Sequence, residues 1–204
     1  MAFPVPLASK MSGATVNQLQ YWRSTGVLRP EIESAKAPLL YSFRDIVALR
    51  TVAWLRADHS LQAVRKALST LSELDMVEHP ASYKLVKLGN SIGVAVEGDS
   101  AIDLVKEPGQ STVGTLEDVF AEFETKNHRK VDPLLHPRAG VEVNPAKLGG
   151  WPTIVGTRIP YDIVATLIED GSVKPSEVAH YYPGVSESAA ADALDYQQSI
   201  IEAA

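Results

Sequence analysis

Five polar residues that suit contacts with nucleic acid lie close together near the start of the chain: Asn17, Gln18, Gln20, Tyr21 and Arg23. The amide of an Asn or Gln can form two hydrogen bonds with the N6 and N7 edge of adenine, so the first three residues suit base recognition. Tyrosine and arginine suit phosphate oxygens, and such contacts orient a protein on DNA without reading its sequence. Together these residue types predict a DNA-contacting surface if one helix carries all five.

The local sequence predicts such a helix. Thr15 is followed three residues later by Gln18, which makes a T-x-x-Q capping box at the helix start. Gly26 suits the left-handed backbone conformation that often follows a helix end. Leu19 and Trp22 are three residues apart, so both are predicted to pack inward. The helix therefore has an apolar inner face and a polar outer face.

A second, shorter helix is predicted just before it, at about 6–11, and a Ser-Gly pair at 12–13 separates the two. Two short helices joined by a glycine-containing turn form the helix-turn-helix arrangement. In that arrangement the second helix enters the major groove with its N-terminal end, here including Thr15, against the base edges. The plainer alternative is an ordinary helical hairpin whose polar face is only solvated.

The remaining elements follow from hydrophobic periodicity and from turn residues. Ser42 and Asp45 form a further capping box at the start of a third helix, and alternating patterns after residue 82 predict a small antiparallel meander. The expected segments are helices from Ser42 and from Leu61, strands at 83–88, 92–96 and 101–105, a helix at 115–124, a linker at 125–138, a hairpin of 140–143 with 151–155, and helices at 161–169, 175–182 and 186–201.

Charge is distributed unevenly along the chain. The whole sequence carries a formal charge of −6, but residues 1–75 hold nine Lys/Arg and six Asp/Glu, giving +3, and residues 76–204 carry −9. This asymmetry predicts a basic binding module attached to an acidic remainder. No apolar run is long enough to cross a membrane, and no secretory signal is evident, so we expect a cytoplasmic protein without a membrane partner. The absence of cysteine excludes disulfides and thiolate chemistry.

The segment 13–30, GATVNQLQYWRSTGVLRP, resembles the start of MerR-family regulators, in which a helix ending in an aromatic pair precedes G-[LV]-L-x-P. Tyr41-Ser42 with Asp45-Ile46 resembles the family's next helix, and Ser60-Leu61 resembles its fourth. The resemblance covers about residues 5–71. It implies a winged helix-turn-helix that binds operator DNA as a homodimer.

The chain departs from the MerR pattern at several positions. Gln20 stands where the family usually has arginine, and Arg23 stands where it has an acidic residue. Ala37-Pro38-Leu39 replaces the Gly-Tyr-Arg of the wing, which leaves Arg29 and Lys36 as basic candidates there. Strand-like residues follow soon after the fourth helix, in place of the family's long dimerisation helix. Dimerisation must then come from elsewhere, and a metal or drug sensor of the usual type is not expected.

The segment 149–160, GGWPTIVGTRIP, resembles a small domain of unknown function found in VapB-like antitoxins of toxin–antitoxin pairs. Its pattern is G-x-P-x-[IV]-x-G-T-R-[IV]-P followed by three helices. Arg158 falls between a strand and a helix, where it can hold a carboxylate or helix carbonyls, or contact a partner. Residues 161–204 hold one Lys/Arg against eight Asp/Glu, so phosphate repulsion argues against a second DNA-binding unit here.

The second resemblance implies an antitoxin that represses its own operon and neutralises a PIN-domain ribonuclease toxin. Such antitoxins often cover the acidic metal site of the toxin with a basic side chain. The candidates for that contact are Arg129, Lys130 and Arg138 in the predicted linker, and Arg158 is a separate candidate for contact with a partner.

Enzymatic chemistry has no visible site in the sequence. The five histidines show no metal-binding spacing, and no P-loop, G-x-S-x-G or G-x-G-x-x-G motif occurs. We therefore expect no catalytic residue, no metal and no cofactor.

The combined prediction is an α+β chain of three parts: a winged helix-turn-helix at 1–76, a β meander with a short helix at 77–128, and a hairpin with a trihelical unit at 139–204. The predicted function is a DNA-binding antitoxin. Two alternatives stay open: a stand-alone MerR-like transcription regulator with an effector site in the middle region, and a pure protein-interaction inhibitor.

Overall fold

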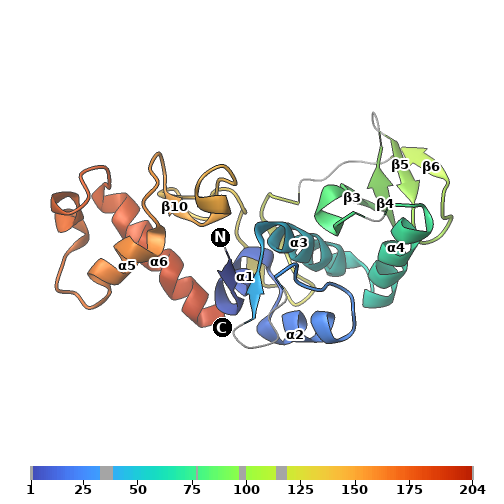
Figure 1. Cartoon of the computed structure of the whole chain (residues 1–204), viewed down its shortest axis with the longest axis horizontal. Coiled ribbons are helices and arrows are strands. Elements are labelled where there is room, and N and C mark those ends of the chain that lie inside the picture. Colours follow the sequence, from blue (N-terminus) through green and yellow to red (C-terminus); the bar gives the residue numbers. More distant parts are fainter. Residues whose placement is uncertain (1, 33–38, 77, 97–99, 114–118, 204) are drawn as a thin grey trace.

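The computed structural model describes residues 2–32, 39–76, 78–96, 100–113 and 119–203. Helices and small antiparallel sheets occupy separate stretches of the chain, which confirms the predicted α+β class. Figure 1 shows an elongated molecule with the C-terminal helices at one end and the meander at the other. Among the described residues, no helix is both long enough and apolar enough to cross a membrane.

Four helices and a two-stranded sheet build the N-terminal part. Both predicted capping boxes are present, because the Thr15 and Ser42 side chains accept the backbone N–H three residues on and the Gln18 and Asp45 side chains return the bond. Ser60 caps the fourth helix with one bond only, in which its hydroxyl accepts the Ala63 N–H. The elements are β1 (Phe3–Pro4), α1 (Val5–Ser12), α2 (Val16–Ser24), β2 (Leu40–Tyr41), α3 (Phe43–Asp58) and α4 (Leu61–Glu73).

The middle part is a four-stranded antiparallel meander that lies against α4. The three predicted strands are present, and a fourth, unpredicted strand completes the sheet. A Cβ at Gly93 would lie 2.5 Å from Leu88 Cδ1 and 2.9 Å from the Ile102 carbonyl, so glycine is required where the strands approach closely. The strands, in spatial order, are β3 (Leu85–Leu88), β4 (Ser91–Ala95), β5 (Ser100–Asp103) and β6 (Ser111–Val113), preceded by the 3-10 turn η1 (Pro80–Ser82).

The helix predicted at 115–124 is wrong over the part that the structure describes. Residues 119–122 form a turn and a bend, and a hairpin follows, made of β7 (Phe123–Glu124) and β8 (Lys130–Val131). The physical reason lies outside the segment. The buried guanidinium of Arg50 on α3 binds the carbonyls of Val119 and Ala121, and the first of these would have to accept the Phe123 N–H in the predicted helix. The predicted residues 114–118 of this helix lie outside the described part.

The C-terminal part matches the expected hairpin and three helices. β9 (Val141–Glu142) pairs antiparallel with β10 (Thr153–Ile154), and the 3-10 turn η2 (Leu148–Gly150) lies between them. The helices are α5 (Tyr161–Glu169), η3 (Pro175–His180) and α6 (Glu187–Ala203), and the second is a 3-10 helix. Gly156 adopts φ +75° in the turn after β10, a conformation that glycine reaches without steric cost.

The predicted linker 125–138 is packed between the two ends of the molecule, not extended in solvent. Val131 and Leu134 are buried, and Asp132 lies 3.0 Å from the ammonium of Lys10 on α1 and 2.9 Å from Arg138. Arg138 in turn contacts Asp195 on α6 at 2.5 Å. Burial alone would raise the pKa of Asp132, but the two cations outweigh it and hold the pKa below its usual value. This chain of ion pairs joins α1 to α6.

The buried core is continuous from Phe3 to Ile200. Phe3 in β1 stacks on Trp151, with ring centroids 5.6 Å apart, and so ties the start of the chain to the C-terminal part. The predicted domain bounds at 1–76, 77–128 and 139–204 therefore stay a prediction, because apolar packing crosses them.

Candidate nucleic-acid interface

Several hydrogen bonds hold the turn between α1 and α2. Gly13 ends α1 with φ +79°, and its N–H bonds the Ser9 carbonyl. The Ser9 hydroxyl reaches across the turn and donates to the Ala14 carbonyl at 2.6 Å. The guanidinium of Arg129 donates to the Gly13 carbonyl. With the capping box at Thr15, these bonds fix the direction in which α2 leaves the turn.

The two faces of α2 differ as predicted. Leu19 and Trp22 are 1% and 2% exposed, which confirms that they pack inward. Asn17, Gln20 and Tyr21 are exposed. Successive residues of an α-helix are about 100° apart, so these three share one outer arc of the helix. This arc is available to a groove of DNA.

The predicted contact residues of α2 differ in whether their side chains already take part in hydrogen bonds within the protein. Gln18 is half-buried, and its side-chain carbonyl accepts the Thr15 N–H at 2.9 Å, so the capping box occupies its acceptor. The Thr15 hydroxyl accepts the Gln18 N–H at 3.2 Å. Asn17 and Gln20 are therefore the amides best placed to read bases, because bidentate adenine recognition needs both a free donor and a free acceptor.

One flank of α2 borders a pocket with a volume of about 330 Å³. Two of the predicted phosphate contacts, Arg23 and Arg29, line this pocket together with Gln20, and both arginines are exposed. Leu39, the last residue of the predicted wing pattern, lines it too. Lys36, the remaining predicted basic contact on this side, lies outside the described residues.

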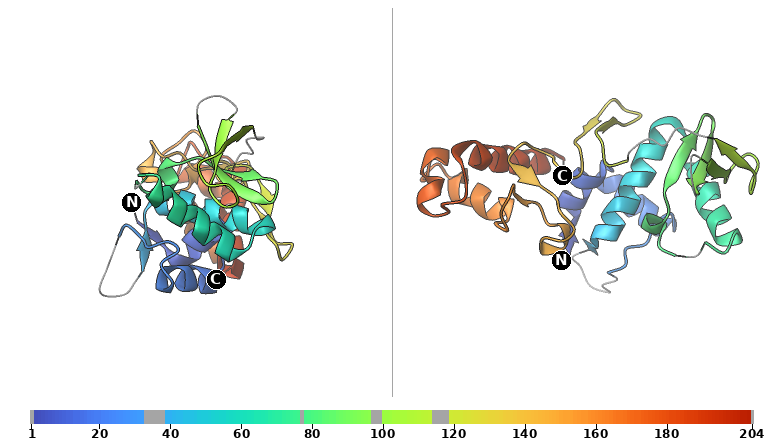
Figure 2. Two further views of the ribbon diagram at one scale, coloured as in Figure 1. Left: turned by 90° about the vertical axis from the view of Figure 1, so that its right-hand side faces the viewer. Right: turned by 90° about the horizontal axis from the view of Figure 1, so that it is seen from above.

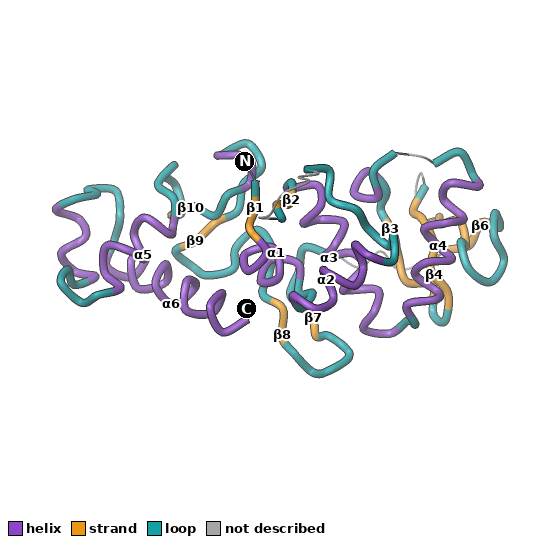
Figure 3. Tube along the Cα trace, turned by 60° about the horizontal axis from the view of Figure 1, so that its bottom comes forward, coloured by secondary structure: helices purple, strands orange, loops and turns teal. Residues whose placement is uncertain are grey.

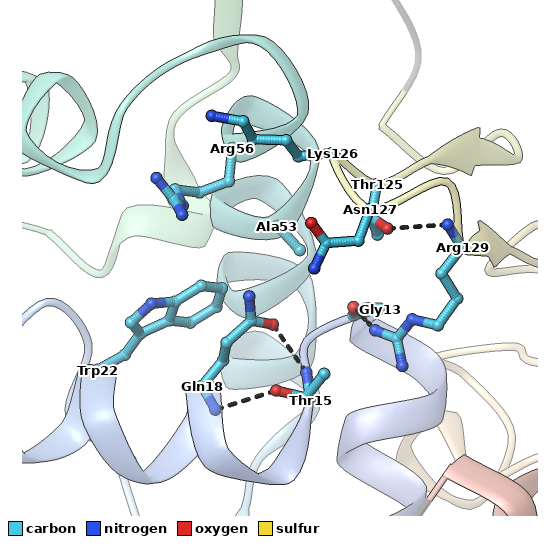
Figure 4. A pocket seen from close by; sticks show the side chains of 10 residues that line it. All are labelled: Gly13, Thr15, Gln18, Trp22, Ala53, Arg56, Thr125, Lys126, Asn127 and Arg129. Carbon is cyan, nitrogen blue, oxygen red and sulfur yellow. Dashed lines mark hydrogen bonds between the residues drawn. The ribbon is translucent and has the colours of Figure 1, made fainter.

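The other flank of α2 borders a second pocket, with a volume of about 310 Å³, between α2, α3 and the β7–β8 hairpin (Figure 4). Arg56 of α3 and Lys126 of the hairpin line it beside Arg129. Sequence reasoning did not assign Arg56 or Lys126 to the site. The basic run at 126–130, K-N-H-R-K, was a usable signal for Lys126, but Arg56 is brought in only by the packing of α3.

A further cation lies against the exposed face of α2. The guanidinium carbon of Arg65 on α4 is 5.7 Å from the ring centroid of Tyr21, a cation–π geometry. Sequence reasoning also missed Arg65. The contact holds the Tyr21 ring at the edge of the outer arc, beside the polar residues of α2.

The four residues predicted to contact a protein partner have different environments. Arg129 is held by the Gly13 carbonyl, and burial lowers its pKa. Arg138 is held by Asp132 and Asp195, and their hydrogen bonds and charges outweigh burial and raise its pKa. Lys130 is largely exposed and lies 3.6 Å from Glu122. Arg158 is exposed in the turn after β10.

One group of side chains has the composition of a metal site. Ligand atoms of Glu31, Asp45 and His79 lie within 4.8 Å of one another. The Asp45 carboxylate accepts the backbone N–H groups of Glu31 and Ser42 and lies 3.3 Å from His79 Nε2. These bonds already satisfy the buried carboxylate, and they tie the residues after α2 to the start of α3.

The fold and this site define a class of protein. A glycine turn between two short helices is the arrangement of helix-turn-helix proteins, and in this chain cations lie on both flanks of the second helix.

The family comparisons agree with that class. Residues 5–71 match the family described as MerR HTH family regulatory protein, so the N-terminal part is a MerR-type helix-turn-helix. Residues 141–197 match the family described as protein of unknown function (DUF433).

Comparisons with whole proteins give partial matches and one similar fold. Over 113 residues the chain is 32% identical to "uncharacterized HTH-type transcriptional regulator Rv1830" of Mycobacterium tuberculosis, covering 53% of this chain and 49% of that protein. The same values hold for "uncharacterized HTH-type transcriptional regulator Mb1861" of Mycobacterium bovis. The chain thus spans about half the length of these curated relatives. The crystal structure of Rv2018 from M. tuberculosis has the same fold, with a TM-score of 0.57, 16% identity, and coverage of 95% of this chain and 96% of that one.

Proposed function

We propose that this chain is a sequence-specific DNA-binding transcription regulator whose helix α2 enters the major groove. The observation that carries the proposal is the outer arc of α2, where Asn17 and Gln20 are exposed between two flanks that both carry arginines. Amides supply base discrimination, and the flanking cations supply phosphate contacts. The MerR-type match and the names of the relatives support this function.

The uneven distribution of charge along the chain favours one orientation of the protein on DNA. Residues 1–75 carry +3, while residues 76–204 carry −9. Phosphates attract the first part and repel the second, so the acidic remainder favours approach through the helix-turn-helix. We propose that the DNA-bound form is a homodimer. Its two-fold symmetry requires an inverted repeat with half-sites about 34 Å apart, or a multiple of that spacing.

A binding titration tests this function. The full chain is titrated against the duplex upstream of its own reading frame and against a shuffled duplex of equal length, by fluorescence anisotropy at several salt concentrations. We expect tighter binding to the upstream duplex and a steep loss of affinity with salt, because phosphate contacts release counterions. Equal affinity for the two duplexes contradicts sequence-specific binding, and no affinity for either contradicts DNA binding altogether. A response to small molecules added to the same titration tests the effector site that the sequence suggested in the meander.

The likeness of residues 149–160 to VapB-like antitoxins favours a second candidate function, neutralisation of a PIN-domain ribonuclease. Internal contacts engage Arg129 and Arg138, so Arg158 is the better candidate for the toxin contact, since it is exposed beside the matching motif. The test is inhibition of a PIN-domain ribonuclease encoded by a neighbouring gene. Arg158→Ala is expected to weaken inhibition, whereas Arg44→Ala, which removes an exposed arginine of α3, is not. Absence of inhibition by the unmodified chain contradicts this candidate and leaves the regulator proposal intact.

A further inference from the structure

The β7–β8 hairpin presents a basic turn at its tip. Glu124 pairs with Lys130 across the two strands, and the Thr125 N–H bonds the Arg129 carbonyl at 3.0 Å. The His128 N–H bonds the Thr125 carbonyl at 2.9 Å, which closes the turn. Lys126 is exposed at this tip. The hairpin therefore holds the K-N-H-R-K run in a defined shape.

Tertiary contacts fix this hairpin beside the reading helix. Arg129 bonds the carbonyl of Gly13, in the turn that leads into α2. Val131 is buried against the same glycine, since a Cβ there would lie 2.6 Å from Val131 Cγ2. Arg50 binds the Asp132 carbonyl at 2.8 Å just after the hairpin. Figure 3 shows β7 and β8 next to α1 and α2.

The pocket between the hairpin and α2 is suited to an anion. Its described lining includes three cations, Arg56, Lys126 and Arg129, and no acidic residue. Figure 4 shows the Arg56, Lys126 and Asn127 side chains around one open space above Gln18. Within the described residues, Arg56 Nε has no hydrogen-bond partner although it is shielded from solvent.

The nearby carboxylates do not cancel this charge within the pocket. Glu124 lies 2.6 Å from His128 Nδ1, and Glu122 lies 3.6 Å from Lys130 Nζ. Both carboxylates are on the hairpin, but neither lines the pocket. The first turn of α2 also contributes, because the N-terminal end of a helix attracts negative charge.

The position of this pocket on α2 relates it to DNA. Taking 100° per residue, Gln18 lies on one side of the outer arc that holds Asn17 and Tyr21, and Arg23 lies on the other. The pocket at Gln18 and the pocket at Arg23 therefore flank the reading face. In the left view of Figure 2, the hairpin (olive) and β2 (light blue) lie on opposite sides of the molecule, in accord with this arrangement.

We propose that the β7–β8 hairpin is a second DNA-contacting arm, outside the helix-turn-helix module, and that Lys126 and Arg56 bind the phosphate backbone of the duplex. This inference rests on the proposed function, because it places DNA along α2. The pocket borders α2 at Thr15 and Gln18, next to the exposed Asn17, so a strand bordering the groove that α2 enters would lie over it. Arg129 acts as a positioning residue, since its bond to Gly13 sets the distance between the arm and α2.

The experiment compares Lys126→Ala with Lys174→Ala, a control that removes the same charge from the loop between α5 and η3. Affinity for the upstream and shuffled duplexes is measured over a range of salt concentrations. We expect Lys126→Ala to weaken binding to both duplexes and to reduce the slope of log K against log salt concentration by about 0.9, the value for one lost phosphate contact. Lys174→Ala should retain the slope of the unmodified chain.

Two further variants distinguish failure of the proposed arm from failure of the proposed function. Arg23→Ala, on the opposite flank, tests the proposed function, and Lys126→Glu strengthens the perturbation of the arm without touching buried structure. A reduced slope for Arg23→Ala with an unchanged slope for both Lys126 variants overturns the arm and leaves the regulator proposal standing. Absence of DNA binding by the unmodified chain overturns both.

Discussion

Replacement of Arg50 by methionine is expected to destabilise the protein strongly and to release the hairpin. Arg50 is 1% exposed, and its guanidinium donates to four backbone carbonyls at 2.7–2.8 Å, those of Met11, Val119, Ala121 and Asp132. One side chain thus ties α3 to α1 and to the segment that contains β7 and β8. Methionine fills much of the same volume but donates to none of these carbonyls.

The loss of stability depends on whether water can replace the guanidinium as the hydrogen-bond donor to each carbonyl. The bond to Met11 is buried, so its loss leaves an acceptor without water, at a cost of about 1–3 kcal/mol. The other three bonds are partly buried, so water replaces the donor in part and each loss costs about 0.5–1.5 kcal/mol. Removal of the buried charge offsets some of the total. We expect a loss of about 3–5 kcal/mol in the free energy of unfolding.

Urea denaturation followed by circular dichroism measures this loss, with Arg44→Met as the matched control. Arg44 is on the same helix, but its side chain is 53% exposed and pairs with Glu31 at the surface, so its loss should cost less than about 1 kcal/mol. Hydrogen exchange should also accelerate in residues 119–132 of the Arg50 variant. Equal destabilisation by both variants, or unchanged exchange in that segment, would refute the role assigned to Arg50.

The remaining predictions concern the turn, the cap and the ion pairs. Gly13→Ala should cost more stability than Gly26→Ala: both glycines have positive φ, but only at Gly13 does a Cβ meet Val131. Thermal denaturation compares them, and equal losses would contradict the packing argument. Gln18→Ala should lower the free energy of unfolding by about 1 kcal/mol, because the Thr15 N–H loses its acceptor. An unchanged free energy of unfolding would show that the capping box does not stabilise the protein. Asp132→Asn should lower stability at neutral pH. Since the folded-state pKa of Asp132 lies below the unfolded value, its contribution is full above about pH 4 and is lost as pH falls further. The stability gap to the unmodified chain, measured across pH 2–7, should therefore close in acid, and a constant gap would argue against the ionised pair.

Local sequence rules predicted most of the N-terminal part correctly. The capping boxes at Thr15 and Ser42, the left-handed Gly26 and the inward packing of Leu19 and Trp22 are confirmed. Each depends on residues within one or two helical turns of one another. That proximity is why single-sequence patterns were sufficient to predict them.

Elements that depend on distant residues were predicted less well. Phe120 and Phe123 have a spacing that suits an amphipathic helix, yet Phe123 belongs to β7 and lies 5.0 Å from the guanidinium of Arg50. That arginine is on α3, far away in the sequence, so no local pattern reports it. The packing of 125–138 was missed for the same reason, because Asp132 and Arg138 find partners on α1 and α6.

In the candidate interface, too, residues within one helix were predicted and residues from other elements were missed. The polar arc of α2 followed from spacing within one helix. Arg56, Arg65 and Lys126 come from three other elements, and only tertiary packing brings them to its flanks. The sequence analysis assigned base contacts to both Asn17 and Gln18, but the capping box that it also predicted engages the side-chain carbonyl of Gln18.

The proposed function assigns base reading to Asn17 and only a contact with the phosphate backbone to Arg23. The direct measurement is the ratio of affinities for upstream and shuffled DNA, determined for Asn17→Ala and Arg23→Ala at one salt concentration. Loss of the Asn17 amide should reduce the ratio by about 1–3 kcal/mol of discrimination. Loss of Arg23 should weaken both complexes by one common factor and leave the ratio unchanged. If both variants preserve the ratio, Asn17 does not read bases and this assignment is contradicted.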